Sequence, residues 1–293
     1  MSGDQNKTAG ICFLREFSSL FEALEEATPV TKSQLKKLGE NKKDWEKSIA
    51  PKEERLVSLD ALNYLKINPL CSNQRMRVLE EDDDFIVLSK GYNCHSHPLK
   101  YSDTNNALSY IRQNFSDKIL TVNSSRFERG LLYRLDYETS GLLIYCKKNF
   151  LHKELRENFA TLVKEKTYYA IVQGNFSSQL LEHKLVYGGP KNSKAKAFGL
   201  EYSEGITASI EARRVEHNKE RDLTMVQIAL EEGHRHQIRA QLAAEGFPIL
   251  GDELYGGERA ARLFLHCYSY SVNGRSAVDE SLDLFSSFFN FNG

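Results

Sequence analysis

Two charged side chains interrupt an apolar stretch of this chain and restrict how it can fold. In Gly130–Ile144, Arg134 and Asp136 stand between the apolar runs at 131–133 and 142–144. Burying a carboxylate costs several kcal/mol unless a cation or hydrogen bonds compensate it. We therefore expect the fold to supply a partner for Asp136, and we expect this carboxylate to have a use.

The pair itself allows two interpretations. If the segment is extended, residues two apart point to the same face, so Arg134 and Asp136 are neighbours before a turn at 139–141. One interpretation is a structural ion pair at a strand end. The other is that Asp136 is a nucleophile or general base in a cleft, because a carboxylate with a reference pKa of about 3.9 is already ionised at neutral pH.

A second charged segment, Glu232–Arg239, is followed by the turn-rich Gly251–Gly256. If a helix begins near His234, then Arg235 and Arg239 lie on one face close to its N-terminus. Positive charge there opposes the helix dipole, so an anion in front of this face would be favourable. The Asp136 carboxylate and a nucleic-acid phosphate are two candidates, and a solvated basic helix end is the alternative.

Adjacent tyrosines mark a third segment, Lys166–Gly174. On a strand, Tyr168 and Tyr169 face opposite sides, so one can pack in the core while the other lines a cleft. A tyrosine in a cleft can stack on a nucleobase and can exchange a proton through its hydroxyl. The alternative is that both are packing residues.

Composition narrows the class of protein. The formal net charge is -1 and 27% of the 293 residues are charged, so nucleic-acid binding would need a local basic patch. The five cysteines are scattered without a CxxC pair, and neither a leader-like segment nor an apolar run of about 18 residues is present. We expect a soluble, cytoplasmic protein that is not bound to a membrane.

The histidines raise the possibility of a metal-dependent hydrolase. The pairs at 95 and 97 and at 234 and 236, with Asp252 and His266, could be assembled into a metal site. However, no HExxH or CxxC motif accompanies them. The acidic run Glu80–Asp84 could bind a cation, but we expect a solvated turn there. We therefore expect no metal.

The order of sequence patterns predicts an α+β fold with a largely antiparallel mixed sheet. We expect residues 1–73 to form a small, mainly helical accessory region and residues 74–293 to form the larger domain, which carries the charged segments. Predicted helices cover 17–24, 31–38, 58–65, 103–115, 150–162 and 234–245. Predicted strands cover 76–79, 85–88, 142–146, 168–172, 206–215, 223–230 and 262–272.

Taken in order, the charged segments resemble one family. The motifs are Arg134–Leu143 (RLDxxTSGLL), Lys166–Gly174 (KxYxAxVxG), His236–Arg239 (HQIR) and Gly246–Gly256 (GxPIxGDxxYG). They are similar in order and spacing to those of the RluA branch of the pseudouridine synthases, over roughly residues 75–272. Residues 30–38 also resemble the opening helix of an S4 RNA-binding module, although Asn41–Arg55 does not complete that pattern.

This resemblance implies an isomerase that converts uridine to pseudouridine in structured rRNA or tRNA, without metal or organic cofactor. Asp136 matches the family's catalytic aspartate, Tyr168 the tyrosine that stacks on the target base and is implicated in removing the C5 proton, and Arg239 the arginine that pairs with the aspartate. An RNA-binding protein that kept the fold but lost catalysis is the first alternative. We expect a monomer.

The chain departs from the family pattern at three places. Tyr133 stands where the family usually has His, Gly233-His234-Arg235-His236 displaces the usual first arginine by one position, and the family's Lys-Pro-x-Gly is reduced to Lys90-Gly91. None of these removes the Asp–Tyr–Arg trio. The expected RNA contacts share a basic or polar side chain near the motifs or in a loop from Gly188 to Lys196: Arg126, Arg129, Arg134, Lys191, Lys194, Lys196, Arg235, His236 and Gln237.

Overall fold

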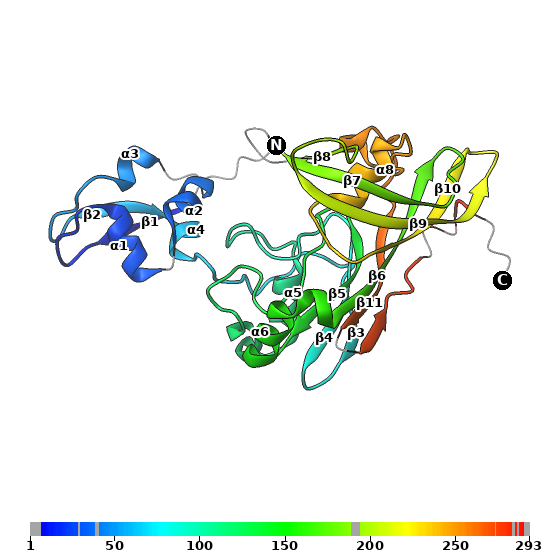
Figure 1. Cartoon of the computed structure of the whole chain (residues 1–293). Helices are drawn as coiled ribbons and strands as arrows, with labels where there is room; N and C mark the ends of the chain where they lie inside the picture. Colours follow the sequence, from blue (N-terminus) through cyan, green and yellow to red (C-terminus); the bar gives the residue numbers. More distant parts are fainter. Residues whose placement is uncertain are drawn as a thin grey trace. The chain divides into compact units, whose positions relative to one another are not determined.

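The computed structural model describes residues 7–28, 30–38, 41–188, 194–272, 274–282, 285 and 287–289. The chain forms two compact units (Figure 1). Residues 1–73 and 97–129 make up the first, and residues 74–96 and 130–293 make up the second. The sequence predicts a single boundary near residue 73; the structure adds that residues 97–129 group with the N-terminal unit.

The N-terminal unit combines helices with a two-stranded antiparallel ribbon. Strands β1 (Thr8–Cys12) and β2 (Glu54–Ser58) pair through Gly10 and Leu56. Its core includes Leu35, Trp45, Ile49 and Val57, all buried. The helices are α1 (Leu20–Ala27), α2 (Lys32–Lys37), α3 (Lys42–Trp45), α4 (Leu59–Leu62), α5 (Ala107–Asn114) and the 3₁₀ turn η1 (Asp117–Thr121).

The ribbon is the part of this unit that sequence reasoning missed. Both strands are five residues long, and β2 begins inside the charge-dense stretch that ends at Arg55, so neither shows a clean alternation. Helix α2 lies where predicted, because Thr31 and Gln34 form a reciprocal capping box at its start. The S4-like interpretation of this unit stays a prediction.

The second unit is built on one large sheet. Its order is β3-β4-β5-β11-β6-β10-β9-β7-β8, with β12 added on β11. The neighbouring strands are antiparallel except β5 and β11, which are parallel. The predicted α+β class with a largely antiparallel mixed sheet is confirmed. The strands are β3 (Arg77–Glu81), β4 (Phe85–Lys90), β5 (Ser140–Cys146), β6 (Val163–Gln173), β7 (Gln179–Tyr187), β8 (Ala195–Phe198), β9 (Ile206–Asn218), β10 (Leu223–Leu230), β11 (Leu265–Val272) and β12 (Arg275–Val278).

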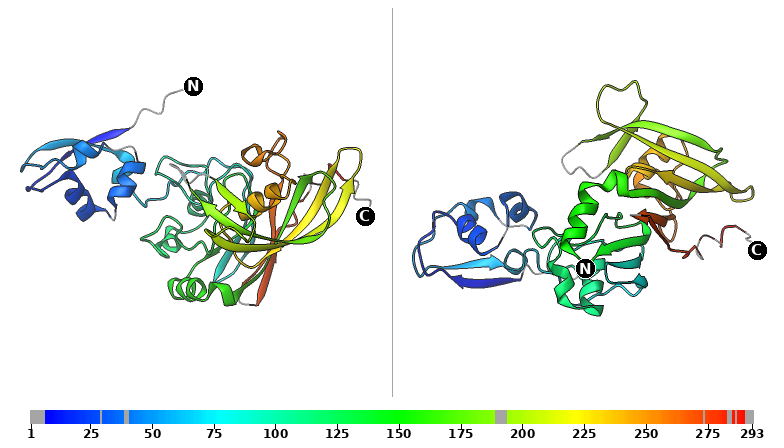
Figure 2. Two further views of the ribbon diagram at one scale, coloured as in Figure 1. Left: turned by 45° about the horizontal axis from the view of Figure 1, so that its top comes forward. Right: turned by 60° about the horizontal axis from the view of Figure 1, so that its bottom comes forward.

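Strand β5 lies inside the sheet, and every one of its residues is buried. Figure 2 shows it in green beside the cyan β4 and the orange-red β11. A strand that is covered on both faces has a continuous apolar run rather than an alternating one. The Leu142–Cys146 run therefore marks the centre of the sheet, and the segment before it delivers Asp136 to this centre.

The helices of this unit among the described residues are α6 (Asn149–Glu157), α7 (Phe159–Leu162), α8 (Gln237–Ala244) and the 3₁₀ turn η2 (Glu253–Tyr255). Helix α8 packs against β7 and β8, where Ala240 joins a buried cluster with Leu185 and Ala208. A larger core between β6, β10 and the other face of α8 includes Ile171, Ile228 and Leu242. No helix among the described residues is long and apolar enough to span a membrane.

Candidate active site

The Asp136 segment is not the strand that its sequence suggests. Residues 134–138 have an irregular backbone, and β5 begins only at Ser140. The Ser96 hydroxyl anchors this segment, because it donates to the Leu135 carbonyl and accepts from the Leu135 N–H, both at 2.9 Å. Arg134 is exposed and Asp136 is half-buried, so the expectation that both point to one face of a strand does not apply here.

Gly141 shows why a glycine follows this loop. Its φ is +117°, and a Cβ at this position would lie 2.2 Å from the carbonyl oxygen of Cys267 on β11. Only glycine adopts this backbone conformation at little cost and also admits such a close approach. The Thr-Ser-Gly turn thus sets the start of β5 directly against β11.

Helix α8 begins later than the sequence predicts. It starts at Gln237, so Arg235 precedes the helix and does not share a face with Arg239. The Gln237 side chain accepts from the His234 N–H at 3.0 Å and donates to the Ser209 carbonyl at 3.1 Å. These bonds close the helix start on itself and on β9. The sequence pattern predicted a helix that starts three residues too early, because periodicity does not show that the Gln237 side chain caps the helix start.

Lys166 fixes the loop that leads to this helix. Its buried ammonium donates to the carbonyls of Glu231 and Glu232 at 2.5 and 2.8 Å. Burial lowers the pKa of Lys166 to about 8, although the nearby carboxylates of Glu232 and Glu231 oppose this shift. The lysine of the KxY motif therefore ties β6 to the end of β10.

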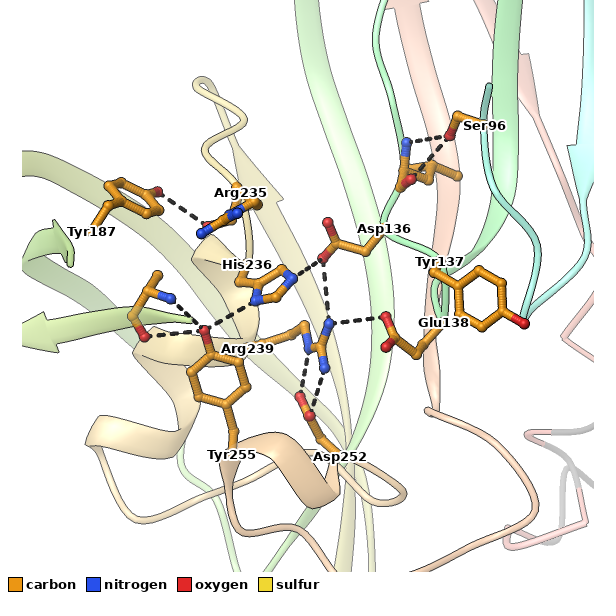
Figure 3. A network of polar contacts seen from close by, with 12 residues as sticks. Ser96, Asp136, Tyr137, Glu138, Tyr187, Arg235, His236, Arg239, Asp252 and Tyr255 are labelled. Carbon is orange, nitrogen blue, oxygen red and sulfur yellow. Dashed lines mark hydrogen bonds and ion pairs between the residues drawn. The ribbon is translucent and has the colours of Figure 1, made fainter. Parts of the chain in front are cut away.

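Arg239 is the hub of the site (Figure 3). Its guanidinium donates two hydrogen bonds of 2.7 Å to Asp252 and one of 3.2 Å to Glu138, and it lies 3.6 Å from Asp136. Both Arg239 and Asp252 are sealed from solvent, with side chains 2% and 0% exposed. Burial alone would lower the pKa of Arg239, but the hydrogen bonds and charges of these acids outweigh it and raise the pKa.

His236 and Arg239 both face the Asp136 carboxylate, but neither forms a hydrogen bond of normal length with it. His236 Nε2 is 3.7 Å and Arg239 Nη1 is 3.6 Å from the same carboxylate oxygen, and 24% of the Asp136 side chain remains exposed. In Figure 3 the carboxylate points from its loop toward both residues. The predicted pairing of Asp136 with Arg239 is present at ion-pair distance, although the tighter partner of Arg239 is Asp252.

Tyr168 lies on β6 opposite Cys267 of β11 and Ile228 of β10. Burial raises the pKa of Tyr168 well above its usual value, and nearby Cys267, Tyr270 and Asp136 add to the shift. Its side chain forms a hydrogen bond with the Cys267 thiol. Tyr169 contacts other partners, since its hydroxyl accepts from Gln227 at 3.2 Å and its ring packs on Tyr268. Tyr168 is therefore an un-ionised phenol at neutral pH.

Seven of the nine residues expected to contact RNA divide into two groups. Arg126, Arg134, Lys196 and Arg235 are exposed. Three others make contacts within the protein: Gln237 is buried at the helix start, His236 faces Asp136, and Lys194 donates to the Leu254 carbonyl at 2.8 Å.

Arg126 and Arg129 belong to the N-terminal unit, and the buried Arg129 guanidinium donates to the carbonyls of Leu65 and Ser124. Because these contacts support the fold, we do not retain Gln237 and Arg129 as RNA contacts. Lys191 lies outside the described residues.

Two of the three departures from the family pattern, Tyr133 and Lys90, lie in the core. Tyr133 is buried, stacks on Tyr270 with 3.9 Å between ring centroids, and donates to the Leu142 carbonyl at 2.9 Å. Lys90 is also buried, and its ammonium donates to the carbonyls of Cys94 and Gly91 at 2.7 and 3.0 Å. Both residues therefore stabilise the strands around the site.

The histidines do not gather into a metal centre. Within the described part of the chain, no group of three or more His, Cys, Asp or Glu side chains is placed to hold a metal ion. His266 bonds Ser140, whereas His95 packs on the Tyr137 ring. The acidic side chains of the 80–84 turn form ion pairs with basic side chains. Arg275 pairs with Glu80 and Asp82, Lys147 with Glu81, and Lys148 with Asp84.

Sequence reasoning missed the roles of Glu138, Asp252 and Tyr255. Asp252 and Tyr255 stand in the fourth motif, where their spacing signalled a turn but not a partner for Arg239 and His236. Glu138 is two residues from Asp136 and offered a local signal, a second acid in the same loop. What the sequence could not show is that one arginine serves all three carboxylates.

Comparison with known proteins agrees with this architecture. Residues 84–244, more than half of the chain, match the family model described as RNA pseudouridylate synthase. Ribosomal large subunit pseudouridine synthase D of Borreliella burgdorferi is 29% identical over 208 residues, which cover 69% of this chain and 62% of that protein. An uncharacterized RNA pseudouridine synthase of Chlorobaculum parvum is 34% identical over 185 residues, which cover 61% of this chain and 55% of that protein.

The chain spans about three fifths of the length of these curated relatives. Among solved structures, human RNA pseudouridylate synthase domain containing 1 has a TM-score of 0.56 at 18% identity, and covers 70% of this chain and 82% of that chain. That likeness shows the same fold. The matched family model and the motifs that surround Asp136 agree, and the chain belongs to the RNA pseudouridylate synthase family.

Proposed function

We propose that this protein isomerises uridine to pseudouridine in structured rRNA or tRNA, with Asp136 as the nucleophile. The observation that carries the proposal is the Asp136 carboxylate, which is partly open to solvent and faces Arg239 and His236 at ion-pair distance in a chain of this family. The named ribosomal relative favours an rRNA substrate. We further propose that the protein acts as a monomer in the cytoplasm.

The proposed reaction needs no external reactant. It breaks the N1–C1′ glycosidic bond, turns the uracil and forms a C5–C1′ bond, while a proton leaves C5 and N1 gains one. Atoms and electrons balance without a redox partner, a metal or a consumed water. An anionic nucleophile divides the step in two through a covalent intermediate. Asp136 is suited to this role because neither neighbouring donor lies within hydrogen-bond distance of it.

Tyr168 is proposed to stack on the extruded uracil and to take part in removing the proton from C5. Because its pKa is raised, it cannot act as a phenolate at neutral pH. Its hydroxyl would instead accept the C5 proton only as it passes its own proton on. Extruding the target base costs a few kcal/mol, which stacking and phosphate contacts can offset.

Asp136→Asn tests the nucleophile. The amide keeps the shape but not the charge, so we expect turnover to fall by at least about 10³-fold while RNA affinity and fold are retained. Tritium release from RNA labelled at uridine C5 measures turnover, and filter binding measures affinity. The matched control is Asp83→Asn, an exposed acid on the β3–β4 turn, which should behave as the unmodified protein does.

Comparable turnover in Asp136→Asn would overturn the nucleophile assignment. RNA binding without tritium release by the unmodified protein, on RNA from cells that lack it, would favour the binding-only alternative.

Tyr168→Phe tests the hydroxyl while it keeps the ring. We expect a loss of turnover of about 10²-fold or more, the usual contribution of a proton-transfer group, with stacking intact. Tyr169→Phe is the matched control, since its hydroxyl bonds Gln227 and not Cys267. Equal turnover in both variants would show that the Tyr168 hydroxyl is dispensable.

The RNA contacts are proposed to include the exposed Arg134 and Arg235, with Arg126 and Lys196 as further candidates. These arginines are needed because Asp252 already neutralises Arg239, so Asp136 and Glu138 leave the site with excess negative charge. Each arginine that contacts a phosphate should contribute about one unit to the salt dependence of RNA binding. An unchanged slope in Arg134→Ala and in Arg235→Ala would remove them from the interface.

A further inference from the structure

The side chain of His236 points into the site, whereas Arg235 beside it in the chain is exposed. Its ring lies between two groups, with Nε2 at 3.7 Å from Asp136 and Nδ1 at 3.2 Å from the Tyr255 hydroxyl (Figure 3). Only 13% of the side chain is exposed. Its backbone is in the left-handed region at φ +55°, which is uncommon for residues other than glycine, although asparagine, aspartate and histidine adopt it more often than the rest. Such strain persists where the surroundings over-determine it, and it concentrates at functional sites.

The hydrogen bonds around Tyr255 limit which protons the imidazole can carry. The Tyr255 oxygen accepts from the Ala195 N–H at 2.9 Å, and its single proton can go to the Ala195 carbonyl at 3.0 Å or to His236 Nδ1. If that proton goes to Nδ1, a neutral ring carries its own proton on Nε2, toward Asp136. If it goes to Ala195, Nδ1 must donate to Tyr255.

In that second arrangement, a neutral ring would turn a bare Nε2 lone pair toward a carboxylate, which is unfavourable. The favourable states are thus the neutral Nε2–H ring and the doubly protonated ring. Both direct an N–H at Asp136.

We propose that His236 is a positioning residue that orients the Asp136 carboxylate for attack, and that the Tyr255 hydroxyl fixes the protonation of its ring. This inference rests on the function proposed above and deepens it. It also changes the role of His236, which the sequence predicts to be an RNA contact. Arg239 alone is poorly placed for this task, because Asp252 and Glu138 hold its guanidinium more closely than Asp136 does.

Burial favours the neutral ring of His236, and the charges around it act in both directions. Burial lowers the pKa of His236; Asp136 opposes this, Arg239 and Arg235 reinforce it, and Glu138 opposes it. These groups come from the loop before β5, from α8 and from the segment before α8. A neutral Nε2–H donor orients a carboxylate without neutralising its charge, which suits a nucleophile.

Two substitutions separate this role from a structural one. His236→Gln places an amide N–H where Nε2 stood, whereas His236→Asn suits the left-handed backbone but reaches only to the Nδ1 position. We expect turnover at saturating RNA to fall by about 10- to 100-fold in His236→Asn, the usual cost of removing an orienting partner, and by less than about 5-fold in His236→Gln. The dissociation constant for RNA should change in neither.

A structural role predicts the opposite order, because asparagine tolerates the backbone better than glutamine. An RNA-contact role predicts weaker binding with unchanged turnover at saturation. Either result overturns the proposal. His234→Gln, the same change two residues earlier, is the matched control and should retain full turnover; melting temperatures confirm that each variant is folded.

A second measurement does not depend on turnover and keeps this inference distinct from the proposed function. Nitrogen chemical shifts of His236 should report the Nε2–H ring at neutral pH. In Asp136→Asn the pKa of His236 should fall, because the carboxylate that raises it has gone. An unchanged pKa, or an Nδ1–H ring, would contradict the proposal even if the protein isomerises uridine, and the expected shifts would support it even if the tested RNA is not turned over.

Discussion

Two clusters of acid, histidine and arginine flank the start of β5, and they differ in how tightly their groups are held. The site cluster comprises Asp136, His236, Arg239 and Asp252. The core cluster comprises Ser140, Arg262, His266 and Asp279. Its first member, Ser140, is only four residues after Asp136 in the chain. Every member of the core cluster is buried.

The contacts of the core cluster are short. His266 Nδ1 lies 2.9 Å from the Ser140 hydroxyl, and its Nε2 lies 2.9 Å from the Asp279 carbonyl oxygen and 3.7 Å from its carboxylate. Arg262 donates to the same Ser140 hydroxyl and lies over the Tyr92 ring. Burial lowers the pKa of Arg262 to about 10. In Arg239, by contrast, neighbouring acids reverse the effect of burial and raise the pKa.

The difference shows what composition alone does not decide. Serine, histidine and aspartate in the core cluster form the series expected of a hydrolase triad, yet all three are closed off from solvent. Asp136 has looser contacts but an open side. A carboxylate that is to form a bond must keep a free oxygen and a path to its target, so the longer contacts of Asp136 mark it as the reactive carboxylate.

The largest expected effect comes from removing the hub of the site cluster. Arg239→Met leaves the fully buried Asp252 without its two 2.7 Å hydrogen bonds, and breaking such a pair from one side costs about 3–5 kcal/mol. Denaturant unfolding should show a loss in this range together with a loss of turnover. Adding Asp252→Asn should recover part of the stability, because the orphaned charge is then removed.

The Arg239→Lys control keeps the charge but not the fork, and it should be less destabilising than Arg239→Met. A cost below about 1 kcal/mol for Arg239→Met would mean that water reaches Asp252, and it would remove the distinction between an open carboxylate and a sealed one.

A smaller effect is expected from the core cluster. Ser140→Ala deprives His266 and Arg262 of a shared partner, which should cost about 1–3 kcal/mol because buried polar groups are left unsatisfied. Turnover per folded molecule should stay within about 2-fold of the unmodified protein, since Ser140 does not contact the site cluster in the described structure. A loss of turnover well beyond the loss of folded protein would show that the two clusters work as one.

The sequence predicted features that arise within one segment better than contacts between segments that lie far apart in the chain. The apolar run at 142–146 predicted a strand, and β5 is present there. Its place inside the sheet and the close approach of Gly141 to β11 were not predicted. The ordered motifs predicted the fold class, which is confirmed. The strands β7 and β8 were missed, because charged residues such as Lys184 and Lys196 lie within them and a loop was expected from Gly188 to Lys196.

The site was predictable only in part, because Asp136, Arg239 and their pairing were expected but the contacts of Arg239 and His236 with Asp252 and Tyr255 were not. Asp136 and Arg239 are both in recognised motifs, and they lie at ion-pair distance. Arg239 lies closer to Asp252 than to Glu138 or Asp136 because the turn at Asp252 packs against α8. The orientation of His236 depends on its left-handed backbone and on Tyr255. These features arise from packing between segments, which residue patterns within one segment do not encode.

The smallest expected effect is electrostatic and involves Lys90, which pairs with Gly141 on β5 and responds to both clusters. Burial lowers its pKa to about 8; Cys94 and Asp136 oppose the shift, and Arg262 reinforces it. Because the folded pKa is below the unfolded value of about 10.5, the unfolded chain binds more protons between these values, and stability rises with pH. Relative to Lys90→Met, the unmodified protein should gain about 2 kcal/mol between about pH 7 and about pH 9.5.

Asp136→Asn should sharpen this result, since removing the carboxylate lowers the Lys90 pKa further and moves the gain to lower pH. Parallel stability curves for the unmodified protein and Lys90→Met would place the Lys90 charge in water instead of the core. A shift on Asp136→Asn, by contrast, would show that the open carboxylate still exerts its field through the interior, although neither Arg239 nor His236 lies within hydrogen-bond distance of it.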